Sequence, residues 1–153
     1  MQTRSRLSKA VRGMAASICT GMEESAYVQS MNQNHDRAAS YYKMAARMAK
    51  LSGDANRSVT LTLRASGSLE DKSNEFAKNK YTQYLSAVIL LDAMHVAHIA
   101  GINNHSNVKL KLDTVRMRLR GALREDKSND QEFEARLRKE LKKYALLRKA
   151  IGE

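Results

Sequence analysis

The feature that most constrains the fold of this chain is the apolar run from Tyr84 to Ile102, YLSAVILLDAMHVAHIAGI. After Tyr84, only four polar or ionisable side chains interrupt it: Ser86, Asp92, His95 and His98. A helix that is apolar over most of its circumference is normally buried inside a protein. We therefore expect residues 84–102 to form a central helix against which the other elements pack.

A membrane span is the alternative interpretation of the same run. Residues 85–102 would cover about 27 Å as a helix, slightly less than the ~30 Å hydrocarbon core of a bilayer. Asp92, His95 and His98 lie near the middle of the run, where ionisable groups are costly in lipid. We therefore expect a buried helix and no membrane contact.

The absence of proline extends the helical interpretation to the rest of the chain. Proline breaks helix interiors and strand ladders, and none of the 153 residues is proline. The sequence predicts an all-α fold, a helical bundle of about five helices in a single domain covering residues 1–153. One alternative stays open: residues 58–64 and 108–112 alternate apolar and polar side chains, as strands do. They could form a small β-ribbon, although an isolated two-stranded ribbon is marginally stable.

The N-terminal segment 1–22 is predicted to be a basic amphipathic helix, which could form a separate arm. Apolar side chains recur every three or four residues, as on one helical face: Leu7, Val11, Met14, Ile18 and Met22. An Arg- and Ser-rich, acid-free start also resembles an organellar transit peptide, so import into an organelle stays open. Cys19 is the only cysteine, so no intrachain disulfide can form. A reducing compartment, the cytoplasm or a virion, is therefore expected.

Positive charge is concentrated at the two ends of the chain. The formal net charge is +11; residues 1–22 carry four bases and no acid, and residues 109–153 carry fourteen bases and eight acids. The region around the apolar run is nearly neutral. Such an imbalance favours polyanionic partners, and nucleic acid is the partner that we expect.

Basic residues on the helix predicted from residue 109 are the clearest functional candidates. One stripe recurs at spacings of seven, four, four and three residues: Lys109, Arg116, Arg120, Arg124 and Lys127. Two further bases, Lys111 and Arg118, are expected to flank it. The N-terminal segment adds a second basic group, made of Arg4, Arg6, Lys9 and Arg12. Arginine suits bidentate contacts with phosphate, so these eleven residues form the predicted nucleic-acid-binding set.

The last predicted helix is also rich in charge, but its charges can neutralise one another. Acids and bases stand three or four residues apart in three pairs: Glu132–Arg136, Glu134–Arg138 and Glu140–Lys143. Such pairs are neighbours on a helix surface. We therefore did not include this helix in the predicted binding set.

Metal binding and catalysis have little support in the sequence. Asp92, His95 and His98 step by three along one helix, but the six-residue jump prevents all three from converging on one ion. His95 and His98 would need ligands from elsewhere, and we favour a buried polar cluster over a metal site. No nucleophile motif or glycine-rich phosphate loop is visible, so we predict no enzymatic activity and no cofactor.

Two functions are compatible with this pattern. The favoured one is a non-enzymatic, nucleic-acid-associated assembly subunit of a virion or ribonucleoprotein, which contacts the phosphate backbone without sequence specificity. The alternative is an assembly adaptor for an acidic protein, with the methionine- and tyrosine-bearing segment 1–51 supplying apolar contacts. Other protein subunits, including further copies of the chain, are expected partners in both cases.

Overall fold

The structure is a computed structural model that describes residues 2–71, 79–102, 108–125 and 131–151, with the backbone alone described for residues 2–8, 108–110 and 125. All secondary structure in these ranges is helical. The six helices described are α1 (Gln2–Met31), α2 (His35–Leu51), α3 (Ala55–Glu70), α5 (Lys80–Ile99), α6 (Val108–Glu125) and α7 (Gln131–Ile151). The all-α prediction is confirmed.

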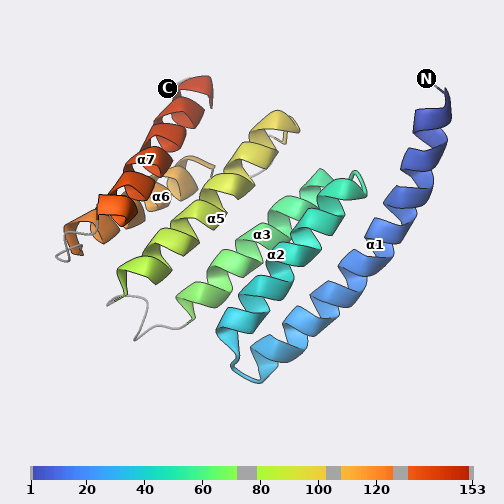
Figure 1. Ribbon diagram of the computed structural model, residues 1–153, viewed down its shortest axis with the longest axis horizontal. Helices are drawn as coiled ribbons and strands as arrows, with labels where there is room; N and C mark the ends of the chain where they lie inside the picture. The colour runs from blue at the N-terminus through green and yellow to red at the C-terminus, as the bar shows by residue number, and fades with distance from the viewer. Residues whose placement is uncertain (1, 72–78, 103–107, 126–130, 152–153) are drawn as a thin grey trace.

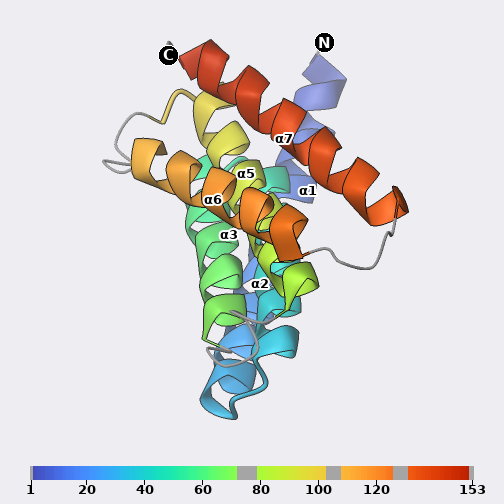
Figure 2. The ribbon, with the colours of Figure 1, turned by 90° about the vertical axis from the view of Figure 1, so that its left-hand side faces the viewer.

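The helices follow one another across the molecule in chain order, and each packs mainly against its sequence neighbours (Figure 1). Contacts between non-consecutive helices define two layers. Ion pairs join α1 to α3 and α3 to α6. Side chains of α2 and α5 line one groove together, and side chains of α5 and α7 line another. Figure 2 shows α6 and α7 inclined to α2 and α3.

The apolar run forms most of α5, which lies between the two halves of the core. Asn79 starts this helix, since its Oδ1 accepts hydrogen bonds from the backbone N–H groups of Tyr81 (3.0 Å) and Thr82 (3.3 Å). One apolar cluster joins α1, α2 and α3 and includes Ile89 of α5. The other joins α5 with α6 and α7 and takes most of the remaining buried side chains of α5. The end of the run is open, however, because Ile99 is 72% exposed.

The β-ribbon considered for residues 58–64 and 108–112 does not form, because these segments lie within α3 and α6. Asp54 caps α3 by accepting a hydrogen bond at 3.0 Å from the backbone N–H of Arg57. The hydroxyls of Thr60 and Thr62 donate to carbonyls four residues earlier in the helix. Alternation of apolar side chains in α3 was thus misleading: Val59 and Leu61 are both buried, but against different clusters.

Helix α1 covers the predicted segment from Gln2 onward and continues to Met31. Among its described side chains, those that it buries are small, Ala15, Cys19 and Ala26, which allows close approach to α2. Three of the larger apolar side chains that were predicted to mark the buried face are instead exposed: Val11 at 52%, Met14 at 66% and Ile18 at 44%. Within the described ranges, none of the other helices covers this side of α1.

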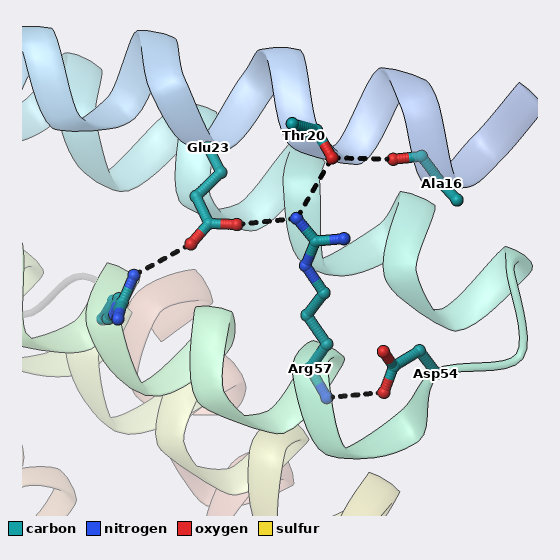
Figure 3. A network of polar contacts seen from close by, with 6 residues as sticks. Ala16, Thr20, Glu23, Asp54 and Arg57 are labelled. Carbon is teal, nitrogen blue, oxygen red and sulfur yellow. Dashed lines mark hydrogen bonds and ion pairs between the residues drawn. The ribbon is translucent and has the colours of Figure 1, made fainter.

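A three-residue ion-pair network ties α1 to α3. Both carboxylate oxygens of Glu23 are used: Oε2 accepts from Arg57 Nη2 at 2.9 Å and Oε1 from Arg64 Nη1 at 3.0 Å. Figure 3 shows the Arg57 guanidinium reaching from α3 to Glu23 and also to the hydroxyl of Thr20, at 3.3 Å. These contacts fix the register of the two helices.

Within the described residues, none of the helices combines the length and the apolar character that crossing a bilayer requires.

Candidate nucleic-acid interface

The centre of the predicted basic stripe lies on the exposed surface of α6. Arg116, Arg120 and Arg124 are all exposed. They are spaced four residues apart, so each lies about 6 Å along the helix axis from the next. Among the side chains that the structure describes, none of these three arginines forms an ion pair. Because the three side chains are exposed, an anion from outside the chain can approach them.

Arg118 lies on a different side of α6, with its side chain only 12% exposed. Its Nη1 donates to Ser86 Oγ at 2.7 Å and to Ser66 Oγ at 3.4 Å, and its Nη2 pairs with Glu70. The buried Val115 and Leu119 separate it from the exposed stripe. Arg118 thus links α6 to α3 and α5, and its donors are already occupied within the chain. Lys111, the other predicted flanking base, is half-buried.

The structure describes only some of the remaining predicted side chains. The side chains of Lys109, Arg4 and Arg6, and the whole of Lys127, lie outside what the structure describes. On α1, Lys9 and Arg12 are exposed, and the Arg12 side chain lies against Gly53 at the turn between α2 and α3.

A second basic surface, on α2, was not among the predicted residues. Lys43, Arg47 and Lys50 recur at spacings of four and three and line a groove of about 310 Å³ between α2, α3 and α5. Elsewhere in this groove the described lining comes from Ala46, Ser58, Thr62, Ile89, Asp92, His95 and Val96. Within the described part of the chain, none of these three bases has an ion-pair partner. We call this the α2 groove.

A neighbouring groove of about 440 Å³ lies between α5 and α7 and shares Asp92 and His95 with the α2 groove. Its other lining residues are Leu91, His98, Lys143, Leu146, Leu147 and Ala150. Both shared residues belong to α5. Although Asp92 is exposed, surrounding atoms desolvate its carboxylate and raise the pKa; Glu140 raises it further, while Lys143, Lys43 and His95 lower it.

The predicted self-neutralisation of the last helix is confirmed. In α7, Glu132 pairs with Arg136 at 2.9 Å, Glu134 with Arg138 at 2.7 Å, and Glu140 with Lys143 at 3.2 Å. Two of the pairs are on the open surface, whereas Glu140 is buried. Arg148 also reaches Asp113 of α6 at 3.1 Å. These bases are therefore less available to a polyanion than the arginines of the stripe.

The prediction of a buried polar cluster at Asp92, His95 and His98 is wrong, because all three side chains are exposed. The run is covered by neighbouring helices on its apolar sides, and these three residues occupy the side left open to solvent. Over the described ranges, no group of three or more His, Cys, Asp or Glu side chains is arranged to hold a metal ion.

Comparisons with protein-family models, with curated proteins and with solved structures found no match for this chain.

Proposed function

We propose that this chain is a non-enzymatic, nucleic-acid-associated assembly subunit, a component of a virion or ribonucleoprotein, that contacts the phosphate backbone without reading the base sequence. The observation that carries the proposal is the exposure of Arg116, Arg120 and Arg124 without ion-pair partners in the described residues. An arginine whose charge is not balanced within its own chain gains most from an external phosphate, through charge-assisted and often bidentate hydrogen bonds.

Binding of this kind is driven largely by counterion release. The affinity should fall steeply with salt, with a slope of about −0.9 in log K against log[salt] per phosphate contacted on duplex DNA. It should depend little on sequence. The formal charge of +11 would add a long-range attraction that speeds association at low salt.

The test is a fluorescence-anisotropy titration of labelled duplex with the full chain at several salt concentrations. The Arg120→Gln/Arg124→Gln variant should bind more weakly and its salt slope should be shallower by about 1.8. The matched control is Arg136→Gln/Arg138→Gln, which removes the same charge from two exposed but paired arginines. Equal losses in both variants, or wild-type binding weaker than about 100 µM in low salt, would reject the proposal.

The exposed apolar side of α1 favours a second candidate, an assembly adaptor for an acidic protein. Val11, Met14 and Ile18 present apolar surface to solvent, and the exposed bases Lys9 and Arg12 lie on the same helix. Methionine suits adaptable apolar contacts, and the bases would attract acidic groups at the rim. A pull-down that survives nuclease treatment and is abolished by Met14→Asp/Ile18→Asp supports this function over the first; recovery of nucleic acid alone contradicts it.

A further inference from the structure

The α2 groove combines three features that a nucleotide site requires. Its α2 rim carries Lys43, Arg47 and Lys50, which lie on adjacent turns of one helix. Like charges at such spacings repel one another, and Asp92 is the one acid among the described lining residues. A phosphate placed among the three bases would replace this repulsion with attraction.

The floor of the groove is apolar. Ile89 is 2% exposed and Ala46 is 5% exposed, and the partly covered Val96 extends this surface. A purely inorganic anion would leave this floor uncovered. The volume of about 310 Å³ is at the lower end of the range for small-ligand sites. The groove therefore suits a ligand with one anionic end and a compact body that has an apolar face, such as the flat ring of a base.

The wall opposite the α2 bases offers hydrogen-bond acceptors. Ser58 Oγ donates its proton to the Ala46 carbonyl at 2.9 Å, and Thr62 Oγ1 donates to the Ser58 carbonyl at 2.7 Å. Because both protons are used, these hydroxyls present lone pairs to a ligand. The Asp92 carboxylate adds a stronger acceptor. Acidic side chains accept hydrogen bonds from the exocyclic amino group of a base such as cytosine.

We propose that the α2 groove binds a single unpaired nucleotide, with its phosphate held by Lys43, Arg47 and Lys50 and the amino group of its base donating to Asp92. The inference rests on the proposed function and adds one base contact to it: backbone contacts on α6 stay independent of sequence, whereas the α2 groove would hold one exposed base of a single strand. Unpaired bases are accessible in this way, whereas bases within a duplex are not.

The experiment is a calorimetric titration of the full chain with cytidine monophosphate at low salt. Three comparisons follow from the geometry. Cytidine, which lacks the phosphate, should bind at least about tenfold more weakly. Lys43→Gln/Arg47→Gln should lose about tenfold for the monophosphate. Asp92→Asn should reduce the preference for cytidine monophosphate over uridine monophosphate, because the acceptor for the amino group is weakened.

The matched control is Lys139→Gln/Lys142→Gln, which removes two exposed bases of α7 outside both grooves. This variant should bind the monophosphate as the wild type does. Equal weakening in the two double variants, equal binding of cytidine and its monophosphate, or no wild-type binding would overturn the inference. Duplex binding that still depends on Arg120 and Arg124 would leave the proposed function standing, so the two failures are distinguishable. Titration with single-stranded oligonucleotides then shows whether the ligand is a nucleic-acid strand or a free nucleotide, since a strand should bind more tightly than its monomer.

Discussion

Arg118 of α6 donates a hydrogen bond from Nη1 to Ser86 Oγ of α5 at 2.7 Å. Ser86 is fully buried and its hydroxyl also lies 2.8 Å from that of Ser66 in α3. The pairing with Glu70 completes a polar link among three helices. An arginine in this position contributes to stability and not to a surface charge pattern.

Replacing Arg118 with alanine should therefore lower the free energy of unfolding by about 1.5–3 kcal/mol, the range for buried hydrogen bonds to charged groups. Urea unfolding followed by circular dichroism measures this change. Arg116→Ala, two residues away on the exposed surface, is the control and should change stability by no more than about 0.5 kcal/mol. A loss below about 0.5 kcal/mol for Arg118→Ala would show that the polar link contributes little.

Glu23 is a second position at which one substitution should weaken the contact between two helices, α1 and α3. Glu23→Gln weakens both ion pairs to α3, each of which is partly exposed and worth about 0.2–1 kcal/mol. We expect a loss of about 1 kcal/mol in low salt, decreasing as salt screens the charges. Glu24→Gln, at the exposed neighbouring residue, should have a much smaller effect. A loss that does not depend on salt contradicts an ion-pair origin.

Cys19 should be unreactive in the folded chain. Its side chain is fully buried, and burial raises the pKa of the thiol, although Arg57 opposes the shift. The thiolate is the nucleophile, so labelling with a disulfide reagent at pH 8 requires transient opening of the contact between α1 and α2. Labelling should be at least about tenfold slower than in denaturant. Rapid, stoichiometric labelling of the native protein would show that this contact is open in solution.

Asp92→Asn should stabilise the protein at neutral pH. The raised pKa of Asp92 means that the folded chain binds the proton more tightly than the unfolded chain. Stability is therefore lost as pH rises through the interval between the two pKa values. Above that interval the variant should be more stable by about 0.5 kcal/mol or less, and below it the two proteins should agree. Urea unfolding at both pH values measures the difference, and a less stable variant at neutral pH would contradict the sign.

Periodicity and the lack of proline were sufficient to predict the helical class and the paired charges of α7, because both depend on residues within a few positions of each other. Which side of α1 is covered was not predictable in this way. Small Ala15 and Cys19 pack inward, and the larger Val11 and Met14 do not. The choice depends on how closely α2 can approach, which spacing within α1 does not reveal.

The candidate site also combines features that spacing predicts with features that it does not. The spacing that identified Arg116, Arg120 and Arg124 correctly predicted their common exposed face. At 3.6 residues per turn, Arg118 lies about 160° around the helix from Arg116 and Arg120, so the spacing within α6 already places it off the stripe. Its partners Ser86 and Glu70 lie far away in the sequence, so the spacing could not reveal them. Lys43, Arg47 and Lys50 carry a similar spacing signal in α2. They were missed because the six bases of residues 23–68 are accompanied by four acids, so the average charge of that segment is modest.

The arrangement of each helix beside its sequence neighbours has a consequence for the kinetics of folding. Contacts that are local in sequence close short loops, and chains of this kind fold quickly for their size. In a stack of such units, stability spreads from neighbour to neighbour, so the terminal helices can fray while the middle stays formed. Amide hydrogen exchange should then be slowest in α3 and α5 and fastest toward the open side of α1.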